Sequence, residues 1–246
     1  QHALALLGEM PHLGVAPNAI SCNAAISACK KDGKWELALA LLFSMPRLHL
    51  APDAVSCSAA ISACEKNRRW KPALELFGLM PRLALKPDVF SCGAAMSACE
   101  EGGQWELALA LLGAMPRLRV APDSVCCSSA ISACEKTGQW QSAVELLLAM
   151  QRSRLPPDVV NCNSAIRACK TSGQWRLAVA LFRSIGELRL QPTLLSCTEA
   201  VGACEGRGRA PRSAVALLES VTGLLPTMSG GMFACRPGSP TRALYK

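Results

Sequence analysis

The sequence predicts an all-α fold, a solenoid of helix-turn-helix repeats with a 35-residue period. Two residue types recur independently at this constant step, which is the sign of a tandem array. They are Cys22, Cys57, Cys92, Cys127, Cys162 and Cys197, and Trp35, Trp70, Trp105, Trp140 and Trp175. Composition adds a third observation. Half of the residues are hydrophobic but only 4% are aromatic, so the core must consist of aliphatic side chains, methionine and cysteine.

Five full repeats are expected, each ending on the residue that follows a proline: 19–53, 54–88, 89–123, 124–158 and 159–193. Residues 1–18 are expected to be the end of a truncated repeat. Residues 194–222 are expected to form a degenerate capping repeat, because Ala210 stands where the other repeats have tryptophan. Residues 223–246 are rich in glycine, proline and serine, and an irregular tail is expected there.

The first half of each repeat is expected to be a helix, as in AVSCSAAISACEK of the second repeat. Cys57, Ala60, Ile61 and Cys64 follow one another at helical spacing and predict one buried stripe. Asp53 can cap the start of this helix. At its end, a residue with left-handed backbone is expected at the recurrent glycines Gly33, Gly103, Gly138 and Gly173.

The second half is expected to be another helix, with WKPALELFGLM as the example. Its predicted apolar stripe consists of Trp70, Ala73, Leu74, Phe77 and Met80. The Lys-Pro dipeptide before Asp88 is expected to end it, because proline cannot continue a helix. Such a hairpin is too small to be stable alone, so neighbouring hairpins must stack.

The opposite face of the first helix is polar except at its start, where Val55 precedes Ser58 and Ser62. Every repeat has an apolar residue at this second position: Ile20, Val55, Phe90, Val125, Val160 and Leu195. Periodicity alone leaves two interpretations open. The side chains either contact a ligand with flat apolar surfaces or staple the helix start to its neighbour.

The period of 35, the small-residue first helix, Ala73 and Leu74, Met80 and the closing Pro87-Asp88 together resemble the pentatricopeptide repeat, from residue 1 to about residue 220. The tetratricopeptide repeat is a poorer match, since it has a period of about 34 and different first-helix residues. The resemblance implies a right-handed α-solenoid that binds single-stranded RNA along its concave face, one base per repeat. It also implies a role in RNA processing, stabilisation or translation in a chloroplast or mitochondrion.

In this family, the fifth and last residues of a repeat read the base, and the second residue clamps it. The resemblance therefore implies these reading pairs: Asn23 with Asp53 for uracil, Ser58 with Asp88 and Ser128 with Asp158 for guanine, Gly93 with Asp123 without a clear preference, and Asn163 with Thr193 for a pyrimidine. The implied RNA tract is U-G-N-G-Y. The apolar second-position series would be the clamp. The alternative for the four aspartates is plain helix capping, and the two roles can coexist.

The formal net charge of +8 favours a polyanionic partner, though only mildly. Lys31, Lys66 and Lys136 share one position near the end of the first helix and are candidates for phosphate contacts. Glu101 and Thr171 interrupt the series. A second interpretation therefore stays open: a protein-interaction scaffold built on the same solenoid, with other proteins of an RNA-processing complex as its partners. A partial array without an independent function stays open as well.

No catalytic residues, metal ligands or cofactor site are predicted, because His2, His12 and His49 lie in no metal or triad spacing and no phosphate-binding loop occurs. The protein is not expected to be an enzyme, and neither a small-molecule substrate nor a membrane is expected as a partner, since no apolar run reaches the roughly 20 residues of a membrane span. Cys57 and Cys64 are separated by about 10.5 Å along a helix, too far for a disulfide. They are predicted to pack as small hydrophobic residues.

Overall fold

The computed structural model describes residues 2–10, 12–153 and 155–205. In these ranges the chain is helical and contains no strand, as predicted. The first helices of the repeats are α2 (Ala19–Lys31), α4 (Ala54–Lys66), α6 (Val89–Glu101), α8 (Ser124–Lys136), α10 (Val159–Thr171) and α12 (Leu194–Glu205). The part of the expected degenerate repeat beyond residue 205, and the expected irregular tail, lie outside the described residues. None of the described helices is both long and apolar enough to cross a bilayer.

The second helices are α3 (Trp35–Ser44), α5 (Trp70–Leu79), α7 (Trp105–Ala114), α9 (Trp140–Arg152) and α11 (Trp175–Glu187). They are preceded by α1 (His2–Glu9), and the short 3₁₀ helices η1 (Met45–Leu48) and η2 (Pro81–Leu83) follow α3 and α5. Each second helix packs against the first helix of its own repeat and that of the next repeat. The described chain is therefore a solenoid of stacked hairpins.

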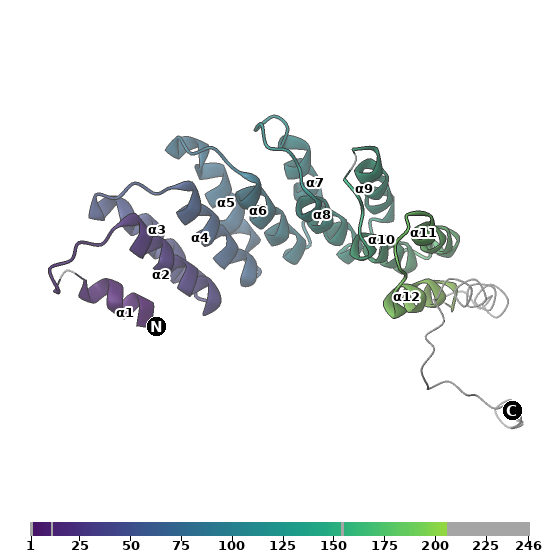
Figure 1. Ribbon diagram of the computed structural model, residues 1–246, viewed down its shortest axis with the longest axis horizontal. Coiled ribbons are helices and arrows are strands. Elements are labelled where there is room, and N and C mark those ends of the chain that lie inside the picture. The colour runs from purple at the N-terminus through teal and green to yellow at the C-terminus, as the bar shows by residue number, and fades with distance from the viewer. Residues whose placement is uncertain (1, 11, 154, 206–246) are drawn as a thin grey trace, which may run out of the picture.

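The hairpins form an arc, with the row from α4 through α6 to α8 on its inner side and α5, α7 and α9 on its outer side (Figure 1). The most extensive packing between repeats joins successive first helices. Their buried residues are mostly alanine, cysteine and serine, which let helices approach closely. The second helices carry bulkier leucine, methionine and tryptophan side chains. A tight inner row and a bulky outer row make the array curve.

The first helices begin at side-chain caps, as predicted for Asp53. The Asp53 carboxylate accepts the backbone N–H of Ser56 at 2.7 Å, and the Ser56 hydroxyl accepts the backbone N–H of Asp53 at 2.8 Å. This reciprocal pair satisfies two donors that the helix start leaves free. Asp88 and Asp158 form the same box, and Asp123 caps Cys126 through one bond of 2.8 Å.

The predicted left-handed residues at the helix ends are confirmed: φ is +68° at Gly33, +66° at Gly103 and +70° at both Gly138 and Gly173. In the second repeat Arg68 occupies this place with φ of 56°, a conformation that a side chain makes less favourable. The turn geometry is thus kept where the sequence offers no glycine.

The predicted end of the second helix at Lys-Pro is wrong. Helix α5 already ends at Leu79, and η2 follows. The reason is Pro81, which has no backbone N–H for the next helical hydrogen bond and sits at the start of the 3₁₀ turn. The three repeats with Met-Pro-Arg have second helices of 10 residues. The two repeats without that proline have second helices of 13 residues.

The cysteines pack in the core, as predicted. Cys57, Ala60, Ile61 and Cys64 are at most 1% exposed. The cysteines of the described residues are all buried except Cys197. Burial raises the pKa of the Cys64 thiol to about 11, which keeps it protonated and unreactive near neutral pH.

Candidate nucleic-acid interface

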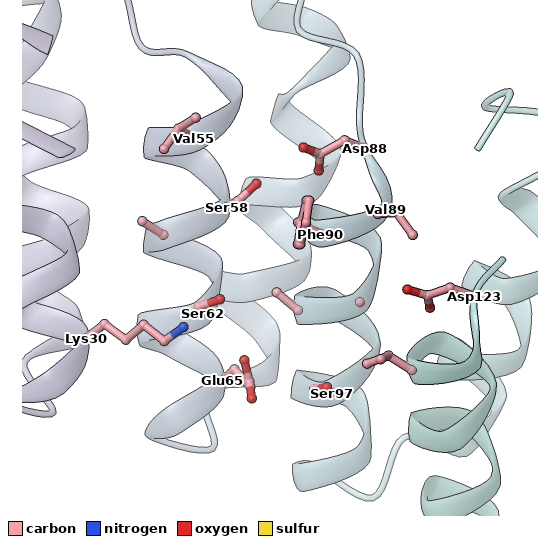
Figure 2. A pocket seen from close by; sticks show the side chains of 14 residues that line it. Lys30, Val55, Ser58, Ser62, Glu65, Asp88, Val89, Phe90, Ser97 and Asp123 are labelled. Atoms are coloured by element: carbon pink, nitrogen blue, oxygen red, sulfur yellow. The ribbon is translucent and has the colours of Figure 1, made fainter. Parts of the chain in front are cut away.

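A groove of about 570 Å³ lies on the row of first helices, between α4 and α6, and extends to α2 and α8. Three side chains of the apolar second-position series line it: Val55, Phe90 and Val125. Four of the predicted base-reading residues line it as well: Ser58, Asp88, Gly93 and Asp123. In Figure 2 the Asp88 carboxylate and the Ser58 hydroxyl lie on either side of the space between α4 and α6. The structure therefore brings members of both predicted sets together in one groove.

The apolar second-position residues are all exposed, from 46% at Leu195 to 78% at Ile20, with Phe90 at 77%. Stapling a helix start would require these side chains to be covered by a neighbouring residue. Their exposure disfavours that interpretation. A row of exposed apolar side chains with a regular repeat spacing suits a ligand with flat faces of the same periodicity.

In the first repeat the predicted reading pair is in direct contact. The Asn23 amide nitrogen Nδ2 donates to both carboxylate oxygens of Asp53 at 3.3 Å. The carboxylate fixes the orientation of the amide, because an amide oxygen in that place would face another acceptor. The Asn23 oxygen Oδ1 consequently has no protein partner among the described residues.

Serine at the fifth position behaves differently. The Ser58 hydroxyl donates to the carbonyl of Ala54 at 2.7 Å, while Asp88 caps Ser91 at 2.8 Å. The pair therefore shares a groove but not a hydrogen bond. The Ser128 hydroxyl likewise donates to the carbonyl of Ser124 at 2.7 Å, and it also accepts the Asn161 amide N–H at 2.7 Å.

The two remaining pairs are less regular. Gly93 is buried, and a Cβ atom added to it would meet only the Cys126 sulfur, at 4.0 Å. Asn163 is 5% exposed, and its Oδ1 has no partner among the described residues. Thr193 caps α12, since its hydroxyl accepts the Ser196 N–H at 3.2 Å. The structure gives no hydrogen bond between Asn163 and Thr193.

The lysines predicted to contact phosphate are not equivalent. Lys31 and Lys66 are exposed. Lys136 instead forms ion pairs with Glu101 at 2.8 Å and Glu100 at 3.2 Å. Burial lowers the pKa of Lys136, but its bonds to Glu101 and the charge of Glu100 outweigh this and raise it. Lys136 is thus already neutralised by the preceding repeat.

Further ion pairs continue along the C-terminal halves of the first helices. Arg167 pairs with Glu135 at 2.8 Å and Glu199 at 3.5 Å, and Lys170 pairs with Glu199 at 2.9 Å. Each pair joins neighbouring repeats. Many of the cations on this side of the row therefore connect repeats to one another.

Among the charged residues that line the groove, sequence reasoning missed Lys30 and Glu65. Both lie seven residues after the fifth residue of their repeat, two helical turns further along the same face. This seven-residue spacing is a signal in the sequence from which both residues could have been predicted. The prediction had chosen the next residues, Lys31 and Lys66, which are about 100° further round the helix. Burial raises the pKa of Glu65, so the floor of the groove carries a carboxyl group that gains a proton more readily.

Sequence comparison gives the family. A profile described as "Pentatricopeptide repeat domain" matches residues 5–67 and 145–207. A second profile, described as "PPR repeat", matches residues 55–84 and 125–155. The chain belongs to the pentatricopeptide repeat family. No curated protein sequence matches it significantly.

Solved pentatricopeptide repeat structures share the fold. The crystal structure of the pentatricopeptide repeat protein PPR10 from maize matches with a TM-score of 0.71 and 23% identity, over 90% of this chain and 32% of that chain. PPR10 in complex with an 18-nucleotide psaJ RNA element matches with a TM-score of 0.70 and 23% identity, over 89% and 31%. This chain thus spans about a third of PPR10.

A shorter relative is covered almost completely. The pentatricopeptide repeat domain of Arabidopsis thaliana protein-only RNase P 1, in complex with tRNA, matches with a TM-score of 0.61 and 14% identity. The match covers 70% of this chain and 90% of that one.

Among the described residues of this chain, no group of histidine, cysteine and acidic side chains is arranged to hold a metal ion.

Proposed function

We propose that this array binds single-stranded RNA in the groove of its first helices and selects bases through the fifth and last residues of each repeat. The observation that carries the proposal is the groove between α4 and α6, where exposed apolar side chains and paired polar side chains of successive repeats meet. Bases stack on the apolar side chains. Polar side chains at the helix starts bind the base edges.

The family and the RNA complexes of similar folds support this proposal. PPR10 was solved with a psaJ RNA element and the RNase P domain with tRNA. Within this proposal the reading pairs favour a U-G-N-G-Y tract. We further propose that the array serves RNA processing, stabilisation or translation in a chloroplast or mitochondrion, the usual setting of the family.

Phe90 provides the sharpest test of base stacking. Replacing one stacking side chain with alanine removes about 1–3 kcal/mol per base. Phe90→Ala is therefore expected to weaken binding of a labelled RNA containing U-G-N-G-Y about tenfold. The measurement is fluorescence anisotropy of the 246-residue chain at moderate salt.

Phe43→Ala is the matched control, because Phe43 is also an exposed phenylalanine, at 58%, but lies on the second helix α3. It is expected to leave RNA binding unchanged. Equal losses in both variants would contradict stacking at the groove. If the folded chain binds no single-stranded RNA at all, the proposed function is wrong.

A protein-interaction scaffold is the second candidate. Its supporting observation is a set of carboxylates on the first helices of the second and third repeats: Glu65 lines the groove, and Glu100 and Glu101 pair with Lys136. Carboxylates there oppose phosphate and favour a basic protein segment. Recovery of protein partners after nuclease treatment, with RNA binding unaffected by Phe90→Ala, would favour this candidate.

A further inference from the structure

Asn161 stands at the third position of its repeat, where the other described repeats have a smaller residue: Ser21, Ser56, Ser91, Cys126 and Ser196. It is 1% exposed, which for a polar side chain requires hydrogen-bond partners. Its Oδ1 accepts the backbone N–H of Asp158 at 3.0 Å, and its Nδ2 donates to the Ser128 hydroxyl at 2.7 Å. The backbone donor fixes the orientation of the amide.

One buried amide thus joins the fifth and last residues of the fourth repeat, although it belongs to the fifth repeat. We infer that Asn161 is a positioning residue that holds the Ser128 hydroxyl as a hydrogen-bond acceptor and so sharpens base selection at the fourth repeat. This inference rests on the proposed function, because it concerns a base-reading pair on the same row of first helices.

A hydroxyl group has one hydrogen-bond donor and two acceptor sites. In Ser128 the donor is engaged by the Ser124 carbonyl and one acceptor site by Asn161. The site that remains is an acceptor. Guanine and uracil present a ring N–H on the Watson–Crick edge and can donate to it. At the same position adenine and cytosine present a ring nitrogen lone pair, which leaves two acceptors opposed unless the base shifts to donate through its exocyclic amine.

Ser58 lacks this support. Its hydroxyl donates to the Ala54 carbonyl at 2.7 Å, as Ser128 does to Ser124. The residue that corresponds to Asn161 is Ser91, whose hydroxyl is engaged in the capping box with Asp88. Ser58 can therefore change rotamer by breaking one bond, whereas Ser128 would break two. The fourth repeat should select its base more strictly than the second repeat, although both have serine and aspartate as the reading pair.

A reciprocal exchange tests this. The probes are labelled RNAs containing U-G-N-G-Y and the variants in which the second or the fourth nucleotide is adenine. Asn161→Ser is expected to lower the preference for guanine over adenine at the fourth nucleotide about fivefold, the effect of losing one typical hydrogen bond. The preference at the second nucleotide should not change. Ser91→Asn should raise the preference at the second nucleotide by a similar factor.

The outcomes separate the two proposals. Serine is the natural residue at this position in four other repeats, so Asn161→Ser keeps a capping box, and its melting temperature verifies folding. If this variant binds all the RNAs equally more weakly and the ratio of its affinities for guanine and adenine is unchanged, Asn161 has only a structural role. The inference is then overturned. If the unsubstituted chain binds none of the RNAs, the proposed function fails, and this inference fails with it.

Discussion

Substitutions at Gly93 can change helix stability and base selection independently of each other. It is a glycine in the interior of α6, where this residue type weakens a helix, and it occupies a predicted base-reading position. A Cβ atom at Gly93 would meet the Cys126 sulfur at 4.0 Å, an ordinary van der Waals distance. The site can therefore accept a small side chain without strain.

We predict that Gly93→Ala stabilises the protein by about 1 kcal/mol and Gly93→Ser by about half as much, following their helix propensities. Only Gly93→Ser adds a hydroxyl to the groove, so only this variant should gain a preference at the third RNA nucleotide. Urea unfolding measures the first effect, and binding of RNAs that differ at that nucleotide measures the second. The same preference in both variants would show that the hydroxyl is not the cause.

The sequence predicted many of these residues and the pair Asn23 with Asp53, which are in contact, but it did not predict the other contacts between repeats. The repeat register placed Val55, Ser58 and Asp88 together correctly, because equivalent residues of stacked repeats lie on one face. The contacts Lys136–Glu101 and Asn161–Ser128 join different repeats. Such contacts depend on how far one hairpin is rotated and shifted against the next. A period read from one chain does not contain that information.

Among the helices, the first ones were predicted almost completely and the second ones were not. The first helix has strong signals at both ends, an aspartate cap and a left-handed residue. The second helix has no side-chain cap at its start, and its end depends on whether proline follows the methionine. The proline after the methionine ends the helix earlier than the apolar pattern alone predicts.

The turn between α6 and α7 provides an element-scale prediction. A Cβ atom on Gly102 would lie 2.6 Å from Cγ and 3.0 Å from Cβ of Trp70, so the tryptophan of the second repeat depends on the missing side chain. Gly102→Ala should force Trp70 to move and destabilise the protein by about 1–3 kcal/mol.

Gly113→Ala is the matched control, because nothing lies within 4 Å of a Cβ atom at that position of α7. It should stabilise the protein by up to about 1 kcal/mol through helix propensity alone. Chemical denaturation compares the two variants. Stabilisation by Gly102→Ala would contradict the packing of Trp70 against this turn.

At the scale of the whole molecule, the buried thiols couple stability to alkaline pH. Burial raises the pKa of Cys64, Cys99, Cys134 and Cys169 to about 11, from an ordinary value of 9.0. Between these values the unfolded chain releases protons that the folded chain retains. The contribution of these protonated thiols to the free energy of unfolding is fully present below pH 9 and is lost as the pH rises towards 11.

We predict that the free energy of unfolding falls steeply between pH 9 and 11. The slope of this fall is proportional to the number of protons that the protein releases on unfolding. Replacing Cys99 and Cys134 with alanine should lower that number by up to about two, whatever the effect of the replacement on stability at pH 7. Urea titrations at several pH values give the slope. An unchanged slope would show that these thiols titrate alike in both states.

The two layers of the arc also differ mechanically. Repeat-to-repeat packing is most extensive along the first helices, whereas a second helix is joined to the next repeat through that repeat's first helix. We therefore expect the row of first helices to resist bending more than the row of second helices. If the array bends, the gaps between second helices should change more than the spacing of the groove residues. The distance between successive proposed base-binding positions should then be kept at different curvatures.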